Sequence, residues 1–338
     1  MPRAIRPLLA ALSLSLSLTL PLGSPLQAAE SSSMGKAGGE QAVAADPPAA
    51  DLSRPPQAER SADAARALIR QLPDQEQQLL HAGDEFFLAL WLPANAAEAH
   101  GVVVLVAGDG ESADWPKVLG PLRRKLPDAG WHSLTLSLPD PQDELPRALA
   151  SKAASAATAT AEPPVDANAD ESLPVTDTAQ PDPSTQAEPP PEDAIERHAR
   201  RIKQRIAAAL ELARQQQAKH IVLLGHGSGG YWSLRYLSEE QPADVRSLLL
   251  VDVKPAADAS PGLDELQANL KLATGDFYYQ DLQVERNAAS KRAQASKRQE
   301  HPAYTQVALK ALPGNPEVEQ EQLYRRLHGW LTLQLQAR

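Results

Sequence analysis

The stretch from residue 221 to residue 232 reads IVLLGHGSGGYW, and it decides the fold. Its first four residues are apolar, as expected for a short strand buried on both faces of a sheet. Glycines at positions 225, 227, 229 and 230 permit a tight turn, because glycine adopts backbone conformations that other residues avoid. The segment therefore predicts a buried strand that passes through a glycine turn directly into a helix.

Outward from this segment, apolar strand-like runs alternate with helix-like stretches. Two strands joined by a turn at 82–84 come first, and we expect them to pair as an antiparallel hairpin. The alternation that follows predicts an α/β fold with a mostly parallel eight-stranded sheet and helices on both faces. Strands are expected at 76–81, 85–92, 102–107, 131–138, 220–224, 248–253, 270–276 and 304–312. Helices are expected at 61–71, 115–128, 194–217, 230–240, 285–299 and 317–335.

Two stretches, 29–58 and about 141–191, lack apolar periodicity and are rich in Ala, Pro, Ser and acidic residues. Such segments cannot bury enough apolar surface to offset their chain entropy. We expect a disordered tether at 29–58 and a disordered insert at 141–191. Strand and helix patterns resume after the insert, so residues 59–338 form one interrupted domain.

The first 28 residues have the pattern of a signal peptide. Arg3 and Arg6 precede an apolar run from Leu8 to Leu22, and Ala28 offers a small residue for cleavage. An uncleaved anchor is the alternative, but the run is shorter than the about 20 apolar residues that a membrane span needs. The sequence therefore predicts an exported, periplasmic protein with no transmembrane helix in the mature chain.

Composition excludes several classes of site. The 338 residues include 33 Lys and Arg against 43 Asp and Glu, and this net charge of −10 argues against a general nucleic-acid binder. The absence of Cys excludes disulfides and thiolate metal sites. The eight His residues show no pair at ligand spacing. We expect no metal and no cofactor, and the partners are unknown.

The glycine turn and the strand order together resemble the α/β-hydrolase superfamily. The segments 101–141 and 223–237 resemble, more specifically, an uncharacterised branch of exported bacterial proteins catalogued as a domain of unknown function. This resemblance implies a nucleophile in the turn, an acid after the next-to-last strand and a His after the last strand. It implies nothing about a substrate.

The turn departs from the superfamily motif Gly-His-Ser-X-Gly-Gly. Without gaps, Gly225, His226, Gly229 and Gly230 match, and Gly227 occupies the nucleophile position. Ser228 comes one residue late, and its use as nucleophile would put the bulky His226 where the turn needs a small residue. Two interpretations remain open: a glycine turn that only packs a helix on a strand, and a rearranged site that uses Ser228.

The acid and base positions are also atypical. Asp276 lies near the expected acid position, although a turn or helix-capping role fits equally well. The segment 312–316, where the base is expected, contains no His. His328 falls inside the final helix and His301 precedes the last strand. Without a positioned base, a Ser hydroxyl is a weak nucleophile.

Gly108, Asp109 and Gly110 follow the first parallel strand, where backbone N–H donors for an oxyanion usually lie. The charge of Asp109 would disfavour an oxyanion there, and the alternative is a solvated loop in which Asp114 caps the next helix. The connection 254–269, where a substrate lid is usually built, is short and predicts a shallow, open cleft.

Two further patterns allow other interpretations. Residues 225–230 also fit the dinucleotide fingerprint G-x-G-x-x-G, but that fingerprint opens the first unit of a domain, and here four strands come before it. Basic pairs at 291–292 and 297–298 lie on a polar helix. A solvated helix face explains them, with contact to anionic lipid or cell-wall polymer as the alternative.

Three functional hypotheses follow, in this order. The first is a non-catalytic pseudo-hydrolase with a binding or assembly role. The second is an esterase-like serine hydrolase that uses Ser228, Asp276 and a His supplied from an unusual position. The third is a cell-envelope component in which the disordered segments and the basic helix matter more than the cleft.

Overall fold

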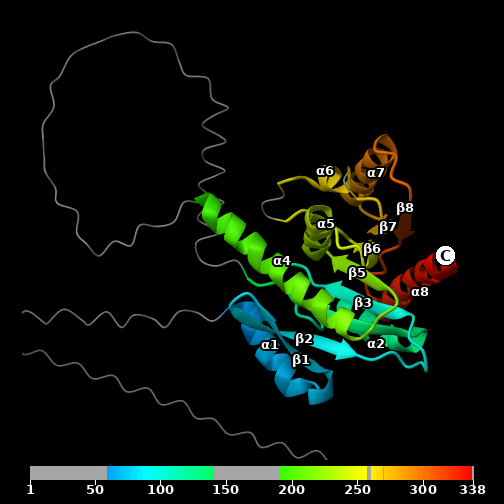
Figure 1. Cartoon of the computed structure of the whole chain (residues 1–338). Coiled ribbons are helices and arrows are strands. Elements are labelled where there is room, and N and C mark those ends of the chain that lie inside the picture. Colours follow the sequence, from blue (N-terminus) through cyan, green and yellow to red (C-terminus); the bar gives the residue numbers. More distant parts are fainter. Residues whose placement is uncertain (1–58, 141–190, 257–259, 269, 337–338) are drawn as a thin grey trace, which may run out of the picture. The chain divides into compact units, whose positions relative to one another are not determined.

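The computed structural model describes residues 59–140, 191–256, 260–268 and 270–336 (Figure 1). The expected signal peptide, tether and insert lie outside these residues, except that Pro191 already begins a helix. The strands are β1 Gln77–Ala82, β2 Glu85–Leu92, β3 Gly101–Val106, β4 Trp131–Leu136, β5 Ile221–His226, β6 Val245–Val251, β7 Ala273–Tyr279 and β8 Tyr304–Leu309. The α-helices are α1 Arg60–Gln71, α2 Leu119–Lys125, α4 Pro191–Gln215, α5 Ser228–Glu240, α6 Leu263–Ala268, α7 Gln283–Arg298 and α8 Pro316–Gln336.

The eight strands form one sheet in the order β1-β2-β4-β3-β5-β6-β7-β8. β1 and β4 both pair antiparallel to β2, and every other pair is parallel. The predicted fold class, including the N-terminal antiparallel hairpin, is confirmed. Because five neighbouring strands from β3 to β8 run parallel, their carboxyl ends meet at one edge, where open α/β sheets usually carry their sites.

Helices cover both faces of the sheet. Apolar side chains of α4, α5 and α6 form one core layer with the sheet, and those of α2 and α8 form the other. In β3, Val102 and Val104 face the first layer while Val103 and Leu105 face the second. This explains the unbroken apolar run, since each such side chain contributes about 1.5–3 kcal/mol when fully buried. The helix α1 packs on β2 in a smaller cluster.

Three local expectations were wrong. The helix expected at 115–128 is limited to α2 and a 3-10 turn at Pro127–Ala129, because Asp114 does not cap it but forms ion pairs with Arg123 and Arg124. The connection between β6 and β7 contains the helix α6, which was not expected. β7 extends to Tyr279 because its aromatic residues continue the strand. None of the helices in the described ranges is both long enough and apolar enough to cross a membrane.

Candidate functional site

The turn between β5 and α5 is the sharpest feature of the parallel edge. β5 ends at His226, α5 begins at Ser228, and Gly227 between them has φ 55° and ψ −127°. This left-handed conformation is costly for residues with a side chain. A nucleophile elbow imposes the same kind of strained strand-to-helix turn on its nucleophile. Gly227 therefore occupies the conformationally special position, and Ser228 is the first residue of the helix.

Sterics explain the glycines two residues before and after Gly227. A Cβ added at Gly225 would lie 2.4 Å from the carbonyl oxygen of Gly229. A Cβ at Gly229 would lie 2.3 Å from the carbonyl oxygen of Ala107, at the end of β3. Both contacts are too close for any side chain, so β5, α5 and the chain after β3 can pack this tightly only with glycine at 225 and 229.

Gly227 has a different reason to be glycine. A Cβ built there would meet no heavy atom closer than the Cα of Gly108, at 3.9 Å. A side chain at 227 would therefore fit, and only the backbone conformation favours glycine. The backbone N–H of Gly227 donates to Val251 at 3.0 Å, and its carbonyl accepts from Lys254 at 3.1 Å. The turn is thus fixed to the end of β6.

The hydroxyl of Ser228 points toward the loop after β3. Its Oγ accepts a hydrogen bond from the backbone N–H of Asp109 at 2.7 Å. Asp109 belongs to the loop in which the oxyanion donors Gly108, Asp109 and Gly110 were expected. The donor of Asp109 is therefore already bonded to a hydroxyl of the same chain. Burial raises the pKa of the Asp109 carboxyl, and the nearby Glu111 and Asp140 charges raise it further.

A carboxylate–imidazole pair lies beside the turn. The Nδ1 of His226 is 2.7 Å from Oε2 of Glu111, and that oxygen also accepts from the backbone N–H of Gly108 at 2.8 Å. An ionised carboxylate only accepts, so the ring donates through Nδ1 in this pair. The sequence did not single out Glu111, because its partner is 115 residues away in the chain.

Asp252 and Lys254 follow β6 and complete the charged surroundings of the turn. Lys254 Nζ is 3.2 Å from Asp252 Oδ2. Burial lowers the pKa of Lys254, but Asp252, Glu285 and Glu111 outweigh this effect and raise it. Lys254 and Arg60 are thus outnumbered by the acids that act near the turn, and this balance disfavours the negative charge of an oxyanion.

Asp276 lies in the middle of β7 and is fully buried. Its two oxygens accept from Nε and Nη2 of Arg292 in α7 at 2.8 and 3.0 Å. Tyr304 and Gln306 of β8 also donate to it. Asp276 aligns across the sheet with Leu250 and Gln306, so it lies within the sheet rather than past its carboxyl edge. The structure does not bring it together with Ser228.

Asp281 is an acid two residues after the end of β7, at the carboxyl edge, and the sequence did not single it out. Its carboxylate accepts a hydrogen bond from the backbone N–H of Ala311, in the loop after β8. This is the loop in which a hydrolase would carry its His, and residues 310–315 contain none. Asp281 thus binds the backbone of the loop instead of an imidazole.

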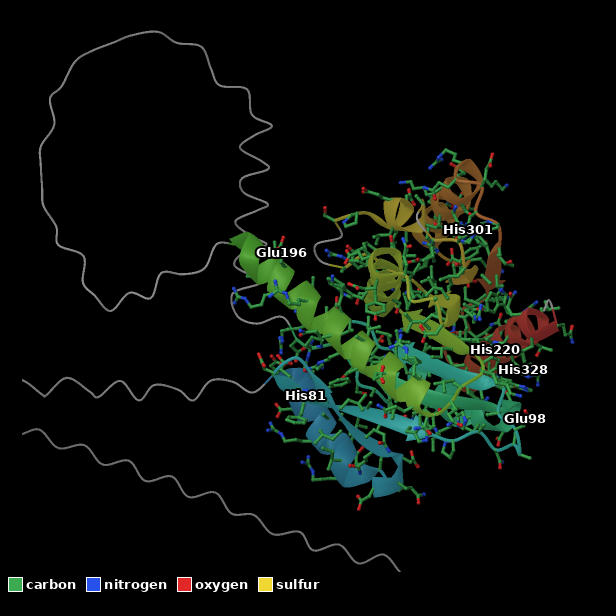
Figure 2. All side chains as sticks on the ribbon, viewed as in Figure 1. His81, Glu98, Glu196, His220, His301 and His328 are labelled. Atoms are coloured by element: carbon green, nitrogen blue, oxygen red, sulfur yellow. The ribbon has the colours of Figure 1, made fainter. Side chains whose placement is uncertain are left out.

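The two C-terminal histidines lie elsewhere (Figure 2). His301 precedes β8, at the amino edge of the parallel strands and opposite the turn. His328 lies within α8, where its ring stacks on Tyr324 with centroids 5.8 Å apart. Within the described ranges, no group of three or more acidic or His side chains could hold a metal ion.

The arrangement can bind a ligand through turn backbone, one imidazole and several carboxylates. Attack by a serine would require a base at Ser228 Oγ. Within the described part of the chain that oxygen bonds to the backbone N–H and to the carboxyl of Asp109, and to no imidazole. The turn has the geometry of a hydrolase elbow, and among the described residues Ser228, Asp276, His301 and His328 do not lie together at it.

A known protein family matches almost the whole length of the chain. The family described as "Protein of unknown function (DUF3530)" matches residues 10–333. This chain belongs to the DUF3530 family. The resemblance to a domain of unknown function on an α/β-hydrolase scaffold is therefore confirmed. No curated protein matches the DUF3530 chain.

Solved structures are similar to this DUF3530 protein at low sequence identity. An esterase from Pyrococcus furiosus has a TM-score of 0.50 and 10% identity, and the match covers 76% of this chain and 89% of the esterase. Est1E from Butyrivibrio proteoclasticus has a TM-score of 0.48 and 10% identity, with coverage of 76% and 99%. A dienelactone hydrolase from Anabaena variabilis has a TM-score of 0.44 and 14% identity, with coverage of 76% and 98%. At these identities the first likeness supports the fold alone.

Proposed function

We propose that this DUF3530 protein is an exported pseudo-hydrolase that uses its scaffold for binding rather than for hydrolysis. One observation carries the proposal: the residue in the strained conformation between β5 and α5 is Gly227, which has no nucleophilic atom. The space above it is open, so packing does not exclude a serine at this position.

The hydrogen bonds around the turn support the same conclusion. Ser228 Oγ is bonded to the backbone N–H of Asp109, one of the donors that would have to stabilise an oxyanion. The Asp109 carboxyl adjoins the same place, and a developing negative charge there would be repelled. Asp281 binds the Ala311 backbone after β8, where a base is absent. Nucleophile, oxyanion donor and base are thus all altered together.

Reaction with a fluorophosphonate probe tests the proposal. The chain is incubated with the probe beside a Ser228→Ala variant and an active serine hydrolase. We expect no labelling of the folded chain, because no hydroxyl is both placed and activated. Labelling that disappears in Ser228→Ala would overturn the proposal, and a cooperative melt of the same sample shows that the unlabelled chain is folded.

The second candidate is an esterase-like serine hydrolase that uses Ser228. It is favoured by His226, whose ring is oriented by Glu111 as a general base is oriented by its acid. In this case a His226→Gln variant would lose labelling together with Ser228→Ala. An Asp276→Asn variant tests the expected acid. We expect its labelling to equal that of the parent chain, because Asp276 is bound by Arg292.

The location of the protein in the cell is a separate part of the proposal. The leader-like first 28 residues support export to the periplasm, and the insert supports a role as a cell-envelope component. Fractionation of cells that produce the chain tests export. Deletion of residues 141–190 tests the insert: unchanged envelope behaviour after the deletion would contradict a role for that segment.

A further inference from the structure

The exposed side of α7 carries a concentration of positive charge. Four cationic side chains on this helix are exposed, and we call them the basic face of α7: Arg286, Lys291, Lys297 and Arg298. Figure 1 shows α7 at the end of the sheet that carries β8, away from α1. Neither the turn at Gly227 nor the proposed pseudo-hydrolase role uses this surface.

Helical spacing arranges the four cations in two rows. Arg286 and Lys297 are 11 residues apart, and Lys291 and Arg298 are seven apart, so each pair repeats on one side of a helix with 3.6 residues per turn. Exposed, uncharged polar side chains lie between the rows: Gln283, Asn287, Ser290 and Gln294. The helix thus presents hydrogen-bonding groups flanked by cations, while Ala289 and Ala295 pack inward.

Several cations in the described ranges form ion pairs within the fold, whereas the four cations of the basic face of α7 do not. Arg292 of the same helix is buried against Asp276. Lys291, Lys297 and Arg298 form no ion pair with any residue in the described ranges. Arg286 donates to the neutral carbonyl oxygen of Asp281 at 3.1 Å and to the side chain of Gln283, so its charge is not neutralised. Four uncompensated charges therefore face solvent on one helix.

The charge of the rest of the chain differs in sign from that of the basic face of α7. The chain has a net charge of −10, so its overall charge does not attract an anionic partner. The single acid of α7, Glu285, acts on Lys254 near the turn. The acids Asp264 and Glu265 belong to α6, beside the carboxyl-terminal end of α7, where Gln299 binds the Asp264 backbone. An anionic surface would contact α7 through the four exposed cations of its basic face.

Two apolar side chains lie at the amino-terminal end of the same helix. Leu282 is 61% exposed and Val284 is 67% exposed. Val284 lies seven residues before Lys291, on the same side of the helix. Exposed apolar groups beside lysines and arginines are typical of helices that lie in a membrane interface. A soluble polyanion would gain nothing from these two side chains, whereas a bilayer would bury them.

We propose that the basic face of α7, together with Leu282 and Val284, docks peripherally on an anionic phospholipid bilayer. The cations contact headgroup phosphates and the two apolar side chains enter the interface. Binding of this kind is reversible and weakens with salt, because exposed charges are screened. No membrane-spanning segment is required.

Sedimentation with vesicles tests the proposal with the full chain. Vesicles of phosphatidylcholine mixed with phosphatidylglycerol are compared with vesicles of phosphatidylcholine alone, at low and physiological salt. We expect binding to the mixed vesicles only, and weaker binding at higher salt. A triple variant, Lys291→Gln, Lys297→Gln and Arg298→Gln, is expected to lose about a hundred-fold in affinity, since each cation near the surface contributes roughly fivefold.

A matched control carries the same change of charge elsewhere. Arg70, Lys117 and Arg246 are exposed and lie outside α7, and their triple change to Gln is expected to leave binding within about twofold. Equal losses in the two triple variants, or no binding of the parent chain to mixed vesicles, would overturn the proposal. Melting curves of both variants show whether each is folded.

Leu282 and Val284 allow binding to a bilayer to be distinguished from binding to a soluble polyanion. The variant Leu282→Ser with Val284→Ser is expected to bind mixed vesicles at least about tenfold more weakly, because less apolar surface is buried. Soluble polyphosphate should compete poorly at the same phosphate concentration. Unchanged vesicle binding by this variant, or displacement by polyphosphate as effective as by vesicles, would overturn the assignment to a bilayer.

Discussion

Ser228 Oγ accepts a hydrogen bond from the backbone N–H of Asp109, with 2.7 Å between oxygen and nitrogen. The bond joins the first residue of α5 to the loop after β3, across 119 residues of chain. It gives a buried serine a structural role, and it occupies a donor that catalysis would need. The role of Ser228 can therefore be measured without any substrate.

Replacing Ser228 by Ala should leave the Asp109 N–H without its acceptor. We expect a loss of about 1 kcal/mol in the free energy of unfolding, the usual net contribution of one hydrogen bond. Hydrogen exchange of the Asp109 amide should become faster, while the amide of Gly108, which donates to Glu111, should keep its rate. Unchanged exchange at Asp109 in the variant would show that the bond does not protect this amide.

Replacing Gly227 by Ser should place a hydroxyl at the centre of the turn with a modest loss of stability. The side chain fits, so only the unfavourable φ opposes it, and we expect a loss of about 1–2 kcal/mol in stability. Fluorophosphonate labelling should stay absent or slow, because no base adjoins the new hydroxyl. Rapid labelling would mean that His226 already acts as that base.

The matched control is Gly225→Ser, two residues earlier. Its Cβ would collide with the backbone of Gly229 and Gly230 at 2.4 Å, so we expect a loss of about 3 kcal/mol or more. Denaturant unfolding of both variants gives the comparison. Equal losses of stability at positions 225 and 227 would contradict this distinction, in which packing requires glycine at 225 and only the backbone conformation favours it at 227.

His198 of α4 should make the protein sensitive to acid. Its buried ring packs edge-on against Trp232, with centroids 6.1 Å apart, and its Nδ1 has no hydrogen-bond partner in the described part of the chain. Burial, together with the positive charge of Arg201, lowers the pKa of His198 from 6.5 to about 4. In the unfolded chain the ring takes up a proton near pH 6.5, so stability is lost as pH falls from about 6.5 to about 4.

The expected loss from His198 alone is about 2–3 kcal/mol over this range. A His198→Gln variant, unfolded with urea at several pH values, should lack this part of the acid dependence. Exposed His81 provides the control: a His81→Gln variant should follow the parent chain. If His198→Gln and the parent lose stability in parallel, His198 is not the group responsible.

Removing one partner of the buried ion pair between Arg292 and Asp276 should destabilise the fold strongly. Both side chains are almost fully buried, and Arg292→Met would leave the carboxylate without its opposite charge. We expect a loss of about 3–5 kcal/mol, typical when one partner of a buried pair is removed. Arg298→Met on the exposed side of the same helix should cost less than about 0.5 kcal/mol. Thermal and urea unfolding of both variants measures the difference.

Much of the fold could be predicted from local sequence. The run VVVLVA at 102–107 and the run at 221–224 are apolar without interruption, and both are central strands buried on two faces. Boundaries were less predictable where tertiary contacts decide them. Asp114 has the sequence position of a helix cap, yet its carboxylate forms ion pairs with Arg123 and Arg124, nine and ten residues further on.

The site was predictable only where it depends on local backbone. The glycine spacing indicated the turn, and the position of Gly227 within it follows from that spacing. Glu111 and Asp281 could not be found this way, because their partners His226 and Ala311 are distant in the chain. The burial of Asp276 depends on Arg292, on a helix whose polar sequence favoured a solvated face.

The close contacts at Gly225 and Gly229 require glycine at both positions, whatever the turn does. Any side chain at either position would push α5 away from β3 and β5, so folding alone retains both glycines. Chemistry at position 227 could be lost or regained without disturbing them. A spaced-glycine pattern of this kind therefore reports the packing of the turn, and any chemistry there depends on the residue at its centre.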